Sequence, residues 1–175
     1  MVIIMTQNLQ TQVHPFPPIY DASSRILILG SFPSVKSRET QFYYGHARNR
    51  FWKTVAAVLH TETPQNIGEK KEFLLNNHIA LWDACASCTI QGSADAAIRD
   101  VVPNDITQIL HTAKIRAIFC NGKTAYTLFQ KHILPKQDLQ NRTPPYFALP
   151  STSPANAGCG EAQLLAAWSC IADYV

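Results

Sequence analysis

The chain has 175 residues, of which 46% are hydrophobic and 15% are charged, and its formal net charge is +3. This length favours one soluble globular domain, and the mild positive charge allows a local basic patch for nucleic acid without requiring one. No apolar run approaches the ~20 residues of a membrane span, and the opening segment 1–5 is too short for the apolar part of a signal peptide. We therefore expect an intracellular, cytoplasmic protein.

Residues 1–22 contain Pro15, Pro17 and Pro18, and we expect them to form an extended arm before a domain that covers residues 23–175. In that domain, short apolar runs alternate with helical patterns, which is typical of a parallel sheet covered on both faces. The predicted strands are 25–29, 78–82, 115–120 and 146–149. The predicted helices are 50–60, 69–76, 105–111, 123–133 and 161–174, with Asn104 capping the third and Gly160 opening the last. The pattern predicts an α/β fold, a single three-layer α/β/α domain with a four-stranded parallel sheet.

Small and polar residues follow each predicted strand, at the edge where open parallel sheets bind ligands. These segments are 30–34, 83–89, 121–124 and 150–156. Their backbone N–H groups and hydroxyls are suited to phosphates, although Gly, Ser, Asn and Pro are also ordinary turn formers. Four such turns on one edge favour a binding site over four unrelated turns.

The most informative segment lies between the first strand and the first helix. It begins with Gly-Ser-Phe-Pro-Ser at 30–34 and ends with Tyr-Tyr-Gly-His-Ala-Arg-Asn-Arg-Phe-Trp at 43–52. A loop that joins a strand to a helix needs only about 2–6 residues, so about twenty residues here indicate a site. Aromatic, amide and basic side chains together suit a flat polar base beside a phosphate, which describes a nucleotide.

These motifs, with Leu81-Trp82-Asp83, Asn121-Gly122-Lys123 and the segment 149–156, resemble the uracil-DNA glycosylase superfamily. Within it they are closest to the hypoxanthine-DNA (deoxyinosine) glycosylase branch, and the resemblance runs from about Arg25 to the C-terminus. It implies a hydrolase of base excision repair that cleaves the N-glycosidic bond of a flipped deaminated base in damaged DNA. The substrate that the resemblance favours is hypoxanthine. It also implies a monofunctional enzyme without lyase activity, and we expect no cofactor and no metal.

The resemblance assigns roles to individual residues. Asn49 matches the residue implicated in catalysis, and Tyr44 matches the ring on which the flipped base stacks. The other base-binding residues it implies are Gly30, Ser31, Phe32, Pro33 and His46. The DNA-binding residues it implies are Ser34, Arg48, Lys123, Ser151, Thr152, Ser153, Pro154, Ala155 and Asn156, and Arg50 and Arg142 are further candidate phosphate contacts.

Several of these roles have a structural alternative. The Asn49 amide has both a donor and an acceptor, so it could hold the water, contact the 6-keto edge of hypoxanthine, or cap the following helix. Tyr43 is either a core aromatic or part of the site. His46 and Asp83 could each act in the site or serve a structural role.

Two positions depart from the superfamily pattern. Phe32 stands where many relatives have an Asp or Asn that orients the water, and Leu149 stands where a histidine supports the departing base. Both departures agree with the hypoxanthine-type branch. They also keep two alternatives open, namely a mismatch-specific uracil (G·U/G·T) DNA glycosylase and a catalytically silent nucleic-acid-binding domain.

Two further motifs are set aside. Gly122-Lys123-Thr124 ends like a P-loop, but the glycine required five places earlier is Ala117. Four of the five cysteines, Cys85, Cys88, Cys159 and Cys170, could in number hold an iron–sulfur cluster, but we expect free thiols packed among apolar side chains. No protein partner is identifiable from the sequence, and we expect a monomer.

Overall fold

The computed structural model describes residues 10–90, 97–136 and 143–175. Its central element is a four-stranded sheet with the strand order β3-β2-β6-β7, in which every neighbouring pair is parallel. The strands are β2 (Ile26–Gly30), β3 (Ile79–Asp83), β6 (Ala117–Asn121) and β7 (Tyr146–Leu149). All four predicted strands are confirmed, with their ends shifted by at most about two residues.

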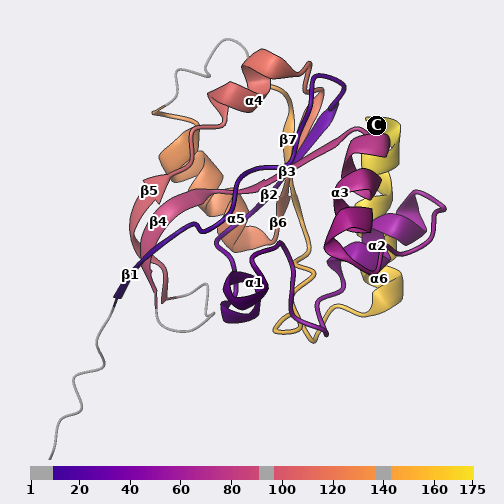
Figure 1. Ribbon diagram of the computed structural model, residues 1–175, viewed down its shortest axis with the longest axis horizontal. Coiled ribbons are helices and arrows are strands. Elements are labelled where there is room, and N and C mark those ends of the chain that lie inside the picture. The colour runs from indigo at the N-terminus through magenta and orange to yellow at the C-terminus, as the bar shows by residue number, and fades with distance from the viewer. Residues whose placement is uncertain (1–9, 91–96, 137–142) are drawn as a thin grey trace, which may run out of the picture.

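The strands β2, β3 and β6 consist of buried residues throughout, because helices cover both faces of the sheet. Figure 1 shows α2, α3 and α6 on one side of the sheet and α4 and α5 on the other. The helices are α2 (Phe51–Val58), α3 (Ile67–Asn76), α4 (Thr107–Thr112), α5 (Lys123–Leu128) and α6 (Glu161–Trp168). A π-helical segment (Phe129–Ile133) continues α5, and a 3-10 segment (Ser169–Asp173) continues α6. The predicted three-layer α/β/α architecture is confirmed.

A second, antiparallel sheet was not predicted. It has the order β1-β4-β5 and is formed by β1 (Gln10–Val13), β4 (Cys85–Ile90) and β5 (Arg99–Pro103). Most residues of β1 and β5 are exposed, and polar residues make up much of both strands, so they lack the apolar run by which a buried strand is recognised. The short helix α1 (Val35–Thr40) also lies outside the predicted elements.

Residues 10–20, which we call the N-terminal strap, lie against the domain. β1 pairs with β4, and Figure 1 shows the two running side by side. Further along the strap, Phe16 is buried, Ile19 exchanges backbone hydrogen bonds with Leu81, and the carbonyl of Pro17 accepts a hydrogen bond from the hydroxyl of Tyr43 at 2.9 Å. The strap therefore contacts both the core and the segment 43–52.

The predicted cap at Asn104 is wrong. Asn104 is buried and its Nδ2 donates to the backbone carbonyls of Asp83 (2.9 Å) and Cys85 (3.1 Å), which need a donor where β3 ends. The carboxylate of Asp105 instead accepts a hydrogen bond from the backbone N–H of Thr107 at the start of α4. The prediction that Gly160 precedes the last helix is confirmed.

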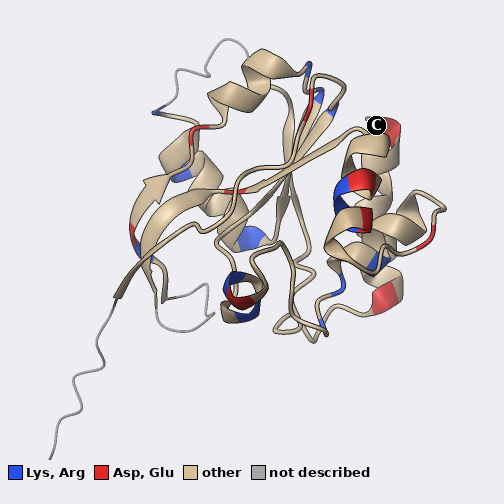
Figure 2. Cartoon of the chain, in the orientation of Figure 1, with Lys and Arg blue, Asp and Glu red and all other residues tan. Residues whose placement is uncertain are grey.

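Charged and thiol side chains are dispersed over the described residues. Figure 2 shows basic and acidic positions next to one another on α3, where Lys70 and Lys71 lie between Glu69 and Glu72.

The five cysteines are free thiols, and the described parts of the chain contain no cluster of three or more His, Cys, Asp or Glu side chains that could hold a metal ion. Within the same ranges, every helix is too short or too polar to traverse a lipid bilayer.

Candidate active site

A cavity of about 1120 Å³ lies at the carboxyl ends of the parallel strands. It brings together residues that follow all four strands, as the sequence predicted for this edge. The predicted site residues that line it are Gly30, Ser31, Phe32, Pro33, Ser34, Tyr44, His46, Asn49, Lys123, Ser151, Thr152, Ser153, Pro154, Ala155 and Asn156. Arg48 is exposed and does not line the cavity, and Arg142 lies outside the described residues.

Asn49 has its carbonyl oxygen fully occupied. Oδ1 accepts hydrogen bonds from the backbone N–H of Phe51 (3.0 Å) and from the hydroxyl of Thr152 (2.9 Å). Because the first of these groups can only donate, the orientation of the amide is determined. Asn49 therefore binds the N–H of the first residue of α2, although the N-cap residue of this helix is Arg50. Within the described residues, the Nδ2 of Asn49 has no hydrogen-bond partner. The side chain can offer the cavity a donor but not an acceptor.

Thr152 is held by Asn121, which belongs to one of the motifs shared with the superfamily but had no predicted role of its own. Asn121, at the end of β6, donates from Nδ2 to the Thr152 hydroxyl (2.9 Å) and accepts from the Thr152 backbone N–H (3.0 Å). Both residues are buried. The resulting chain of hydrogen bonds runs from Asn121 through Thr152 to Asn49, so it fixes Asn49 from the centre of the parallel sheet.

Arg50 supports the segment 150–156, which lines the cavity. Its guanidinium donates to the backbone carbonyls of Ser153, Asn156 and Cys159, and its backbone N–H donates to the carbonyl of Thr152. These bonds satisfy carbonyls that a loop without regular structure leaves unpaired. Arg50 thus shapes the segment 150–156, and protein carbonyls occupy much of its guanidinium.

Tyr44 is backed by the core. Its ring stacks on Phe51, which is fully buried, with 4.0 Å between ring centroids and 25° between ring planes. Its backbone φ is +51°, a left-handed conformation that an aromatic residue seldom adopts and that is common at functional sites. Since Tyr44 also lines the cavity, one face of its ring packs on the core while the residue borders open space.

Tyr43 combines both roles that the sequence left open. It is buried and bonded to the strap through its hydroxyl, yet it also lines the cavity. Burial raises the pKa of the Tyr43 phenol well above its ordinary value, and electrostatic interaction with the Asp83 carboxylate and with the Tyr44 phenol raises it further. The phenol therefore stays neutral and belongs to the wall of the cavity.

His46 has one ring nitrogen occupied. The backbone N–H of Arg48 donates to His46 Nδ1 at 3.1 Å, so a neutral imidazole carries its proton on Nε2. Ser37, which no sequence signal had identified, joins the two halves of the segment 30–52 because its hydroxyl accepts a hydrogen bond from the backbone N–H of Gly45 at 3.0 Å. His46 and Ser37 both line the cavity.

The two positions that depart from the superfamily pattern are apolar parts of the cavity wall. Phe32 and Leu149 are 8% and 7% exposed, and the guanidinium of Arg38 lies 5.7 Å from the centroid of the Phe32 ring. Neither position can bind water. Among the cavity-lining residues that the structure describes, one carries a carboxylate, namely Asp83 at the end of β3.

Comparison with known proteins gives consistent matches. The family model described as the uracil DNA glycosylase superfamily matches residues 17–171. A hypoxanthine DNA glycosylase of Methanosarcina acetivorans is 38% identical over 112 residues, which are 63% of this chain and 71% of the relative. One of Methanosarcina barkeri is 33% identical over 110 residues, 62% of this chain and 70% of the relative. The NMR structure of a candidate uracil DNA glycosylase from Methanosarcina acetivorans superposes with a TM-score of 0.73 at 31% identity, covering 90% of this chain and 96% of the other.

Proposed function

Because the chain belongs to the uracil DNA glycosylase superfamily, we propose that it is a DNA-repair glycosylase that removes hypoxanthine from damaged DNA by hydrolysis of the N-glycosidic bond. The names of the two Methanosarcina relatives support this substrate. The observation that carries the proposal is the cavity at the sheet edge, in which Tyr44 supplies an aromatic wall and Asn49 supplies a hydrogen-bond donor.

A base inside a duplex is out of reach, so the nucleotide must leave the stack and enter the cavity. The ring of Tyr44 is the surface on which the extruded base would lie, and Phe51 behind it prevents the ring from yielding. Stacking of a base on an aromatic side chain contributes about 1–3 kcal/mol. This contribution offsets part of the cost of unstacking the nucleotide.

The donors at the cavity wall match the base that deamination produces. Hypoxanthine carries a keto oxygen, an acceptor, at the position where adenine carries an amino group, a donor. Asn49 Nδ2 and the Nε2–H of His46 can donate to such an oxygen. The amino group of adenine is itself a donor and would accept no hydrogen bond from either of them. The same groups would stabilise the negative charge that builds up on the base as the bond breaks.

The segment 151–156 and two basic residues would contact the DNA backbone. Ser151 and Ser153 place hydroxyls along one side of the cavity, and Lys123 lies on its wall. Thr152 would position this side, because its own hydroxyl and backbone N–H are bonded to Asn49 and Asn121. Contacts of this kind position the duplex without reading its sequence. Arg48 is exposed in the segment 43–52, and it would add a phosphate contact at the rim of the cavity.

We propose that the enzyme leaves an abasic site and does not cut the strand. Strand cleavage by β-elimination would need an amine that forms a Schiff base with the sugar. Lys123 is the lysine that lines the cavity among the described residues, and it is exposed at the start of α5. Borohydride treatment during turnover is expected to trap no protein–DNA adduct, and a trapped adduct lost in Lys123→Ala would contradict this part of the proposal.

A panel of oligonucleotides that carry hypoxanthine, uracil opposite guanine, or thymine opposite guanine at one position tests the function. We expect the fastest base release from hypoxanthine. Faster release of uracil or thymine would favour a mismatch-specific uracil glycosylase. DNA binding without release of any base would favour a silent binding domain.

Two substitutions at Asn49 make the same panel sharper. Asn49→Asp keeps an oxygen that accepts from Phe51 and Thr152 but replaces the donor, and Asp caps helices as well as Asn does. We expect Asn49→Asp to lower the rate of base release by about 10²–10³-fold, the loss typical of a removed transition-state donor, with little change in thermal stability. Asn49→Ala should lose both rate and stability. Full activity of Asn49→Asp would contradict the donor role.

A further inference from the structure

The carboxylate of Asp83 occupies the space in which Gly30 has no side chain. The two residues are paired in register at the ends of β3 and β2. A Cβ built on Gly30 would lie 2.1 Å from Asp83 Oδ1, a distance that no real contact shows. The carboxylate therefore lies directly beside the backbone at which the segment 30–34 begins, on the wall of the cavity.

The two oxygens of this carboxylate have different surroundings. Oδ2 accepts a hydrogen bond from Nε2 of His14 at 2.8 Å, and the side chains of His14 and Asp83 are only 4% and 6% exposed. Oδ1 has no hydrogen-bond partner within the described residues, although Asp83 lines the cavity. A nearly buried carboxylate oxygen without a partner is costly, so this oxygen is available to a water molecule or to a bound substrate.

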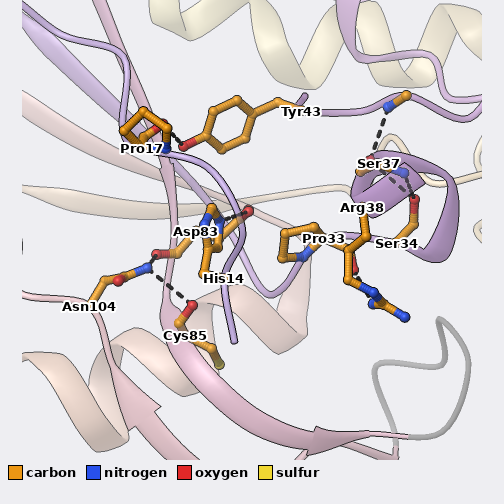
Figure 3. A network of polar contacts seen from close by, with 11 residues as sticks. His14, Pro17, Pro33, Ser34, Ser37, Arg38, Tyr43, Asp83, Cys85 and Asn104 are labelled. Carbon is orange, nitrogen blue, oxygen red and sulfur yellow. Dashed lines mark hydrogen bonds and ion pairs between the residues drawn. The ribbon is translucent and has the colours of Figure 1, made fainter. Parts of the chain in front are cut away.

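His14 belongs to the N-terminal strap and is held in place by its neighbours. Its ring packs against the rings of Phe16, Tyr43 and Phe32, with centroid distances of 4.7, 6.0 and 6.1 Å, and its backbone N–H donates to the carbonyl of Ala86 at 2.8 Å. Figure 3 shows His14 reaching Asp83 while Asn104 binds the backbone carbonyl of Asp83. His14 in the strap and the backbone of Gly30 in β2 thus restrain the carboxylate, and Asn104, which follows β5, holds the backbone of the same residue.

The charge of Asp83 decides which part of a nucleotide it can serve. During glycosidic bond cleavage the base becomes negative and the sugar becomes positive. A carboxylate that faced the base would oppose this separation of charge, whereas a carboxylate that faces the sugar favours it. The donors of Asn49 and His46 already serve the base, and Phe32 supplies no group that could hold the water.

We propose that Asp83 is the catalytic residue that binds the attacking water through Oδ1, and that His14 is its positioning residue. The water oxygen forms a bond to C1′ of the sugar while the C1′–N9 bond breaks and its electron pair leaves with the base. One proton of the water passes to Asp83 Oδ1, and the departing base takes a proton from solvent. This inference rests on the proposed glycosylase function. It assigns the water-binding role, which many relatives give to the position of Phe32 after β2, to Asp83 at the end of β3.

Single-turnover base release from hypoxanthine DNA, measured beside DNA binding, tests the proposal. Asp83→Asn should slow release by at least about 10²-fold, within the range of lost acid–base catalysis, and leave DNA affinity unchanged. His14→Ala should slow release by about tenfold or more, as expected for a misplaced catalytic group, and His14→Gln, which keeps an N–H donor, should recover most of the rate. Asp173→Asn and His111→Gln, both exposed, are the matched controls.

The outcomes separate this inference from the proposed function. A wild-type chain that releases no base overturns both, whereas an active wild type with an equally active Asp83→Asn overturns the inference alone. A changed ratio of hypoxanthine to uracil release in Asp83→Asn, with the rate on one base retained, would mean that Asp83 reads the base, and would also overturn it. If Asp83→Asn does not fold, His14→Ala and His14→Gln decide, because a merely structural histidine would change stability without changing the single-turnover rate of the folded protein.

Discussion

The two sheets of this protein differ in how they are encoded and in what they do. Three strands of the parallel sheet, β2, β3 and β6, are buried throughout, and the carboxyl edge of the sheet places Gly30, Asp83, Asn121 and Leu149 at the cavity. The antiparallel sheet has exposed residues along β1 and β5, and it holds the strap that delivers His14. The comparison indicates that hydrophobic pattern marks the elements that carry the site, while backbone pairing between polar segments adds the elements that support it.

The largest expected difference between the sheets is in stability. Ile28 in β2 is fully buried, so Ile28→Ala should lower the free energy of unfolding by about 2–5 kcal/mol. Val102 in β5 is 53% exposed, and Val102→Ala should change it by less than about 0.5 kcal/mol. Urea unfolding of the two variants measures both values. Similar losses would mean that the two sheets contribute alike and would break the comparison.

A smaller effect is expected at the edge of the parallel sheet, on activity. Gly30→Ala places a Cβ against Asp83 Oδ1, so the carboxylate must move, and a displacement of about 1 Å can cost 10²-fold in rate. A Cβ at Gly158, in contrast, meets no atom within 4 Å. Base release from hypoxanthine DNA should therefore fall in Gly30→Ala and stay at the wild-type rate in Gly158→Ala. Equal rates would show that the position of this carboxylate is unimportant.

The smallest effect concerns pH. Cys120 lies in β6, and burial raises its pKa from 9.0 to about 12. The folded protein keeps this thiol protonated while the unfolded chain ionises, so stability is present below pH 9 and is lost as pH rises from 9 toward 12. The loss from one such group amounts to about 1.4 kcal/mol per pH unit.

Cys120→Ala tests this assignment by urea unfolding at several alkaline pH values. The variant should lose stability with pH less steeply than the wild type. Val102→Ala, in the antiparallel sheet, should keep the wild-type slope. A variant slope as steep as that of the wild type would contradict the role of the buried thiol.

The residues of the candidate site could be predicted more completely than the hydrogen bonds that hold them in place. Asn49, Tyr44 and the segment 151–156 could be selected from the sequence because their residue types follow a strand or match a family motif. The orientation of the Asn49 amide could not, because it depends on Thr152, 103 residues away. The structural role of Arg50 could not be predicted for the same reason, since its carbonyl partners lie in a distant loop.

Local sequence patterns were enough to predict the parallel sheet, the order of its helices and the segments that border the cavity. Apolar runs and turn residues are local properties, and local properties dictate where a buried strand begins and ends. Tertiary structure alone decided that His14 meets Asp83 across 69 positions and that Asn104 binds a strand end instead of capping a helix. A hydrogen bond between distant residues depends on which surfaces the folded chain brings together, and no pattern of neighbouring residues records that choice.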